Sequence, residues 1–165
     1  EATLGGGFRV PLTIGNENLP QHVLPSNGAY AVVAQAFLHK GWEESGFHLF
    51  LLQRVDVNFE NSRYYRYGEG FVTSLVGTTA LVDNIVLALE LQHDYRNKDT
   101  YRDDVMVDSG ARIVSVTPQL AISHGNWDYS IFMNYPLYRY YNGHQLANDF
   151  SIGLACTWQG VIHGD

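Results

Sequence analysis

Residues 112–137 read RIVSVTPQLAISHGNWDYSIFMNYPL. Apolar side chains occupy mainly the even positions up to His124 and the odd positions after Asn126, with small or polar side chains between them. Because successive side chains of a strand point to opposite faces, this period of two predicts two strands joined by a tight turn at Gly125-Asn126. A third strand follows, in which one face carries Phe150, Ile152, Leu154, Cys156 and Trp158.

These strands are long. Each predicted strand has about ten residues or more, against a usual length of about 5–6 residues in soluble proteins. Length and alternation together fit a transmembrane β-barrel, in which the apolar face meets lipid and the polar face lines the lumen. The pattern leaves one alternative open, a soluble up-and-down barrel whose apolar face points inward.

The composition fits a single β-barrel domain over residues 1–165. Charged residues make up only 16% of the chain, against about 25% in soluble domains, whereas Gly and Tyr are abundant. No apolar run approaches the roughly 18 residues of a membrane-spanning helix. The net charge of −7 argues against nucleic acid as a partner, because phosphate binding needs a basic surface.

The single cysteine, Cys156, excludes an internal disulfide and a cysteine-based metal cluster. Glu1-Ala2-Thr3 does not resemble the start of a signal peptide, so we expect a mature chain or a piece of a longer one.

The same alternation predicts further strands, which bring the total to about eight antiparallel strands. They cover residues 3–14, 29–39, 47–60, 70–81 and 85–94. Residues 85–94 could also form a short helix, but their period of two favours a strand. We expect residues 29–39 and 47–60 to pair as a hairpin with His39 opposite His48.

The connections alternate in length. Those at 15–28, 61–67, 96–109 and 141–148 are longer or more charged, with a polar-aromatic loop at 61–67 and a solvated loop at 96–109, whereas those at 40–46, 82–84 and 125–126 are shorter. Outer-membrane barrels have short periplasmic turns and longer external loops. Trp42, Trp127 and Trp158 fall at the short-turn end, where an interfacial aromatic girdle is expected. The sequence therefore predicts an all-β, antiparallel up-and-down transmembrane β-barrel in a bacterial outer membrane.

Residues 135–146 read YPLYRYYNGHQL. This stretch resembles the P-L-Y-x-x-x-N-G-x-Q-L hairpin of the meta-pathway phenol-degradation-like family, a group of Gram-negative outer-membrane barrels. Residues 7–11 and 24–28 also resemble a strand and the loop after it in that family. The resemblance implies passive transport of small, hydrophobic or aromatic solutes.

This chain departs from the family pattern in two respects. Family members have several strands before the segment that resembles residues 7–11, and their aromatic chain end is not followed by an extension such as 159–165. The resemblance therefore implies that the chain is the C-terminal portion of a larger barrel. The alternative is a complete eight-strand barrel whose interior is filled by side chains.

Polar side chains are expected to line the lumen. They are Arg9, Arg54, Asp56, Asn58, Glu60, Glu90, Gln92 and Asp94. Charges inside a small barrel must pair, so these residues either form structural ion pairs that fill the lumen or line a solute path and set its selectivity. The excess of acids favours cations or neutral solutes.

The signals for metal binding and catalysis are weak. His39 and His48 could bind a divalent metal together with Glu43 or Glu44, but two ligands at a rim make a poor site. Ser123, His124 and Asp128 read as turn chemistry, and no serine lies in a G-x-S-x-G elbow. We therefore predict no enzyme, no metal and no cofactor.

Three hypotheses follow. The first is a membrane barrel that passes small-molecule solutes, with membrane lipid around it. The second is a membrane barrel with a structural role, which binds a protein partner through its Tyr-rich external loops. The third is a soluble barrel that binds an apolar ligand inside.

Overall fold

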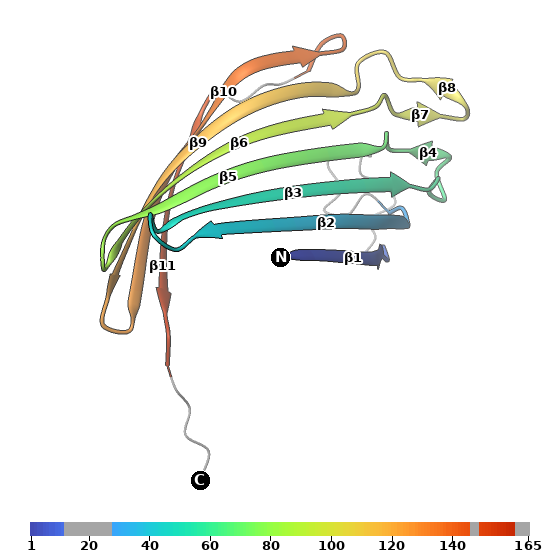
Figure 1. The fold of residues 1–165 in the computed structure, drawn as a ribbon. Helices are drawn as coiled ribbons and strands as arrows, with labels where there is room; N and C mark the ends of the chain where they lie inside the picture. Colours follow the sequence, from blue (N-terminus) through green and yellow to red (C-terminus); the bar gives the residue numbers. More distant parts are fainter. Residues whose placement is uncertain (12–27, 146–148, 161–165) are drawn as a thin grey trace.

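The protein is all-β. The computed structural model describes residues 1–11, 28–145 and 149–160, and most of them belong to one curved antiparallel sheet of eight strands (Figure 1). In chain order these are β1 (Ala2–Arg9), β2 (Ala31–Trp42), β3 (Phe47–Asn58), β5 (Gly70–Val82), β6 (Ile85–Arg96), β9 (Ala111–His124), β10 (Trp127–Tyr141) and β11 (Ser151–Trp158). Each strand pairs with the next along this order, which confirms the predicted number of strands and their up-and-down connection.

The assignment of residues 85–94 to a strand is confirmed. Within the described residues there is no helix with the length and hydropathy that crossing a membrane requires. The expected strand at 3–14 is shorter in the structure, where β1 ends at Arg9, and residues 12–14 lie outside the described part. Most of the expected loop at 15–28 and residues 146–148 also lie outside it.

A second, three-stranded sheet lies at the loop end. It consists of β4 (Tyr65–Arg66), β7 (Thr100–Tyr101) and β8 (Asp104–Val105), in the order β4-β7-β8. The predicted polar-aromatic loop at 61–67 and solvated loop at 96–109 therefore contain short strands that the sequence did not indicate. Their charged composition hides the fact that the two segments pair with each other, which is a contact between distant parts of the chain.

The sheet is open in the part of the chain that the structure describes, so the predicted closed barrel is not seen there. β1 pairs only with β2, and β11 pairs only with β10. In Figure 1, β1 runs across the view while β11 runs steeply down behind the other strands. Neighbouring strands of a sheet are usually rotated by about 20–25°, so over eight strands the direction of the last strand departs from that of the first.

The β2–β3 hairpin has the expected faces but a different register. His39 lies opposite Phe50, and His48 lies opposite Gly41, so the predicted pairing of His39 with His48 is wrong by two residues. The turn is shorter than expected and spans only 43–46. A shift of two keeps every side chain on its face, and for this reason the alternation could not distinguish the two registers.

The short turns gather at one end of the sheet, as predicted. Trp42 ends β2 there, and Trp127 at the start of β10 pairs with Trp158 at the end of β11. The longer connections and the small sheet lie at the other end (Figure 1). The expected sorting of connections by end is thus confirmed.

The two faces of the sheet differ in burial. On the polar face Ser74 is 4% exposed and Ser115 is 6% exposed, whereas on the apolar face Leu89 is 54% and Leu154 is 79% exposed. Side chains crowd together inside a bend and splay apart outside it, so the polar face is concave and the apolar face is convex. Ala29 and Ala31 are the only buried apolar residues in the described part of the chain. The described part therefore has no hydrophobic core.

Gly68 marks a close approach between two backbones at the loop end. A Cβ atom on Gly68 would lie 2.0 Å from the carbonyl oxygen of Asn97. Because backbone atoms cannot move aside without wider rearrangement, we expect Gly68→Ala to lower the free energy of unfolding by about 2 kcal/mol. Denaturant unfolding of the full chain in detergent measures this change.

Gly7→Ala is the matched control. A Cβ atom on Gly7 would have no described heavy atom within 4 Å, so we expect a change of less than about 0.5 kcal/mol. Equal effects of the two substitutions would contradict the close approach at Gly68.

Candidate functional site

All but one of the polar side chains predicted for the lumen share the concave face. Residues that lie opposite each other in paired strands share a face of the sheet. Arg54 lies opposite Val72, and Val72 lies opposite Asp94, so all three are on one face. The same face holds Arg9, Arg54, Asp56, Asn58, Glu90, Gln92 and Asp94. Glu60 does not belong to this wall, because β3 ends at Asn58 and Glu60 is exposed beyond it. The predicted strand 47–60 thus ends at Asn58, and the lumen role of all eight residues stays a prediction.

Arg9, Arg54 and Asp56 form an ion-pair cluster toward the loop end of this face. Arg54 donates two hydrogen bonds to Asp56, at 2.9 and 2.8 Å. Arg9 Nη1 lies 4.0 Å from the same carboxylate, and its Nη2 donates to the side-chain oxygen of Asn58 at 2.5 Å. Asn58 in turn donates to the carbonyl oxygen of Gly68 at 3.0 Å. The basic residues here are thus matched to acceptors, as partial burial requires.

The acids farther along the concave face are not matched in this way. Glu90 accepts a short hydrogen bond from the Ser74 hydroxyl. Neither Glu90 nor Asp94 makes an ion pair with any residue that the structure describes. Two carboxylates without an ion pair thus lie on the concave face, Glu90 nearer its middle and Asp94 in the same row across the sheet as Arg54.

An aromatic stack lies on the same face, between β2 and β3. The ring centroids of His39 and Phe50 are 4.6 Å apart, those of His39 and His48 are 5.3 Å apart, and those of Phe37 and Phe50 are 5.9 Å apart. Sequence reasoning brought the two histidines together but assigned no role to the stacked rings. Its signal was the alternation itself, which puts all four rings on one face.

The two histidines are bonded to each other. His39 Nε2 lies 3.1 Å from His48 Nδ1, and His39 Nδ1 lies 3.8 Å from the Glu1 carboxylate. Glu43 and Glu44 lie in the turn beyond the strands. Within the residues that can be described, no group of three or more His, Cys, Asp or Glu side chains is arranged to hold a metal ion.

The turn between β9 and β10 carries a hydrogen-bonded network. The Ser123 hydroxyl donates to one carboxylate oxygen of Asp128 at 2.6 Å, and the Gln159 amide donates to the other at 2.7 Å. These bonds join the ends of β9, β10 and β11, which confirms the interpretation of Ser123 and Asp128 as turn chemistry.

A buried carboxylate holds the loop end together. Asp99 is 2% exposed and accepts hydrogen bonds from the Tyr65 hydroxyl at 2.5 Å and the Gly68 amide at 2.9 Å. Arg96 Nη2 lies 3.2 Å from the same carboxylate. The backbone amide of Asp99 donates to the Ser109 hydroxyl at 2.8 Å. Sequence reasoning missed this residue, because a buried aspartate looks like a solvated one in a charged segment.

Two ionisable side chains report on this environment. Burial and the hydrogen bond to Asp99 raise the pKa of Tyr65 above its usual value. The hydrogen bond that Asn97 donates, 2.8 Å long, lowers the pKa of Glu69.

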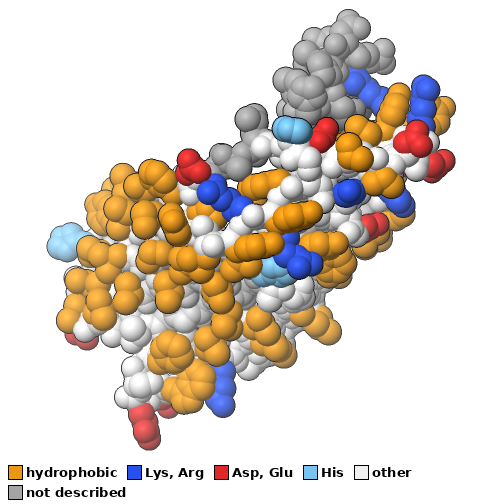
Figure 2. Space-filling model, turned by 90° about the horizontal axis from the view of Figure 1, so that it is seen from above, with side chains coloured by type: hydrophobic (Ala, Val, Ile, Leu, Met, Phe, Trp, Pro, Cys, Tyr) orange, Lys and Arg blue, Asp and Glu red, His pale blue; other side chains and the backbone are white. Residues whose placement is uncertain are grey.

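The convex face carries three belts, which the strand register aligns. At the short-turn end, Trp127 lies opposite Trp158. The middle is aliphatic, and one of its rows is Leu51, Leu75, Leu91 and Val116. At the loop end a row of rings and one cation follows, made of Phe71, Tyr95, Arg112 and Tyr140. Hydrophobic side chains cover most of the surface seen in Figure 2, and acidic side chains lie mainly at its margins.

No family model, curated protein or solved structure matches the chain. The resemblance to the meta-pathway phenol-degradation-like barrels therefore stays a prediction.

Removal of the Asp99 carboxylate should loosen the whole loop end. In Asp99→Ala the groups of Tyr65, Gly68 and Arg96 that now bond to it lose their acceptor. We expect the free energy of unfolding to fall by about 3 kcal/mol, the usual cost of leaving buried partners unmatched. Denaturant unfolding of the full chain in detergent measures this loss.

Two further variants test the cause. Asp104→Ala changes an exposed aspartate of the same segment and should alter the stability by less than about 0.5 kcal/mol. Because the pKa of Tyr65 is raised, its contribution is present below about pH 10 and is lost as the pH rises further. Tyr65→Phe should therefore lose stability less steeply above about pH 10 than the parent chain. An unchanged slope would refute the raised pKa of Tyr65.

Proposed function

We propose that the sheet is the wall of an outer-membrane β-barrel that lets small solutes pass, with its concave face toward the lumen. The observation that carries this proposal is the convex face. It is apolar over eight strands, and it is exposed in a chain whose described residues bury almost no apolar side chain. Exposed apolar surfaces of this extent mark contact with a membrane or a partner.

The dimensions of the apolar surface agree with the proposal. From Ile85 to Tyr95 the convex side of β6 runs about 33 Å, at about 3.3 Å per residue. A strand tilted by about 40° covers about 25 Å of membrane over that length, which is the usual height of the apolar band. Rings at both ends and aliphatic side chains between them match the order of interface and hydrocarbon.

The alternative of a soluble barrel with an apolar ligand inside fits less well. Its interior would have to be apolar, whereas the concave face carries Arg54, Asp56, Glu90 and Asp94. Polar groups at these positions suit a water-filled path.

The proposal requires that the free edges of β1 and β11 be paired in the assembled barrel. Inside a bilayer every backbone amide and carbonyl group needs a hydrogen-bond partner, so an open edge is not tolerated there. The two edge strands, β1 and β11, run in opposite directions, because they are the first and the last of eight antiparallel strands. Antiparallel closure is thus open to them, directly or through an even number of further strands.

The chemistry of the concave face indicates the solute class. Unpaired Glu90 and Asp94 favour cations over anions. The rings of Phe37, His39, His48 and Phe50 offer a stacking surface for flat, aromatic solutes. The family resemblance suggests the same class of solute.

A charge on the convex face separates a membrane protein from a soluble one. Leu89 lies in the aliphatic belt and is 54% exposed. In a bilayer, Leu89→Arg should destabilise the folded chain, lowering its free energy of unfolding by about 2–4 kcal/mol. In water, a change at so exposed a position should be nearly neutral. The measurement is reversible folding of the full chain into vesicles.

Val107→Arg is the matched control, because Val107 is 67% exposed but lies in the loops. We expect it to change folding into vesicles by less than about 0.5 kcal/mol. If Leu89→Arg is as mild as Val107→Arg, the convex face does not meet lipid.

The acids of the concave face should set ion selectivity. We expect the double variant Glu90→Gln/Asp94→Asn to bring the permeability ratio of K⁺ to Cl⁻ close to unity, because it removes the unpaired negative charges. Currents across a planar bilayer measure this ratio.

Glu43→Gln/Glu44→Gln removes the same amount of charge from the turn and should leave the ratio nearly unchanged. A correctly folded barrel without any conductance would instead favour the structural role, with the Tyr-rich loops as its contact surface.

A further inference from the structure

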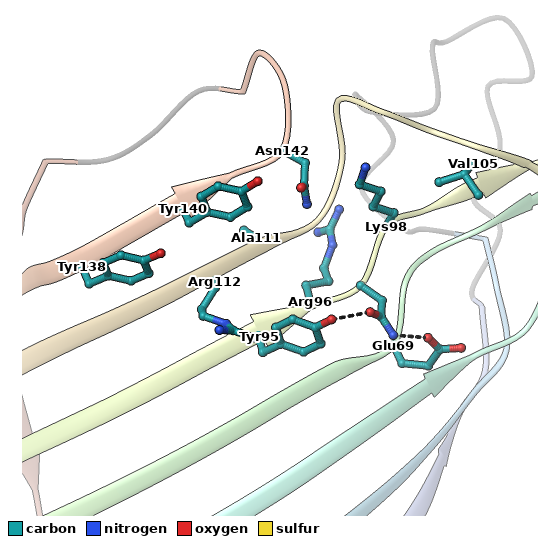
Figure 3. Close-up of a pocket in the computed structure, with 11 residues that line it drawn as sticks. Glu69, Tyr95, Arg96, Lys98, Val105, Ala111, Arg112, Tyr138, Tyr140 and Asn142 are labelled. Carbon is teal, nitrogen blue, oxygen red and sulfur yellow. Dashed lines mark hydrogen bonds between the residues drawn. The ribbon is translucent and has the colours of Figure 1, made fainter.

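We propose that an open cavity on the convex side of the loop end binds the phosphate-bearing headgroup of a membrane lipid. The inference rests on the proposed membrane barrel and deepens it by naming a lipid site on its outside. The cavity has a volume of about 680 Å³ and lies between the loop-side ends of β6, β9 and β10 (Figure 3).

The charge of the cavity favours an anion. Arg96, Lys98 and Arg112 line it together with one acid, Glu69. Arg96 is engaged with Asp99, but neither Lys98 nor Arg112 makes an ion pair with any described residue. The two cations without an ion pair, Lys98 and Arg112, outnumber the single carboxylate of the cavity.

The carboxylate of Glu69 is also held on one side of the cavity. The amide of Asn97 donates to it at 2.8 Å and in turn accepts a hydrogen bond from the Tyr95 hydroxyl at 2.6 Å. Figure 3 shows Glu69 at the opposite side of the cavity from Tyr138 and Tyr140. An anion beside Arg112 and the two tyrosines therefore avoids the acid.

The guanidinium of Arg112 packs over the Tyr95 ring. Arg112 lies directly across from Tyr95 on one side and Tyr140 on the other, and its guanidinium carbon is 5.3 Å from the centre of the Tyr95 ring. In Figure 3, Arg112, Tyr95, Tyr138 and Tyr140 all lie on the same side of the strands. A guanidinium fixed in this way presents two parallel donors, which is the arrangement that a phosphate group accepts.

The surface next to the cavity identifies a lipid as the source of the phosphate. Following β9 toward the short turns, the convex face continues from Arg112 to Val114 and Val116, and Leu91 lies opposite Val116. A ligand with its phosphate at Arg112 would thus lay its chains on the aliphatic belt. Tyrosines and basic side chains at such a boundary lie at the level of lipid headgroups.

The test uses the full chain in dodecyl maltoside micelles and a fluorescent phosphatidic acid as the probe. The matched probe is a diacylglycerol with the same chains and dye but no phosphate. We expect the double variant Lys98→Gln/Arg112→Gln to bind the phosphatidic acid at least about tenfold more weakly, as the loss of a charge-assisted hydrogen bond predicts. Arg139→Gln removes a cation of the concave face, which is bonded to Asp149 at 3.0 Å, and should bind within about twofold of the parent chain.

Each other outcome overturns one specific statement. Equal affinity for the two probes would refute a phosphate site. Displacement of the phosphatidic acid by an equal concentration of inorganic phosphate would mean that the site takes free anions, which refutes a lipid site. Recovery of the folded chain from buffer without detergent would overturn the membrane proposal itself, independently of the cavity.

Discussion

The fold depends on one constraint, the alternation of side chains along each strand, which two register shifts interrupt, at Ala80/Val82 and at Pro136/Tyr138. Eight strands in simple up-and-down order transmit this alternation from neighbour to neighbour, so a single choice of face in one strand fixes the face in all others. The outcome is a sheet with one polar and one apolar side and almost no buried apolar side chain among the described residues. Stability in water normally comes from burying such apolar surface against a second layer. In the barrel proposed above, the bilayer would take the place of this second layer.

The loop end follows a different principle. Its segments have few apolar residues to bury, and a carboxylate takes the place of a core. Asp99 accepts from a hydroxyl and a backbone amide of one segment and pairs with a guanidinium of another, and its own backbone amide donates to Ser109. A hydrogen-bonded network of this kind is specific in geometry, because each donor must point at one oxygen. It can therefore hold the small sheet β4-β7-β8 in place over the end of the large one without a hydrophobic interior.

The sequence was sufficient for features that repeat along the chain. The strand number, the sorting of turns and loops and the shared face of Arg54 and Asp94 all follow from a period of two. It was insufficient where two distant segments meet. The register of the β2–β3 hairpin, the burial of Asp99 and the end of β3 before Glu60 depend on contacts that local composition does not encode. The open edges are a further case, because any pairing of β1 with β11 concerns two strands at opposite ends of the sequence.

The convex face also contains a polar row near the loop end. Gln53, Thr73 and His93 follow one another across three strands, one row below Phe71, Tyr95 and Arg112. The Thr73 hydroxyl donates to the Gln53 side-chain oxygen at 2.6 Å, so these two groups satisfy each other where water is scarce. The next row toward the short turns holds Leu51, Leu75, Leu91, Val116 and Tyr135. In the barrel proposed above, Arg112 would lie at headgroup height, where a guanidinium can keep its charge and meet a phosphate.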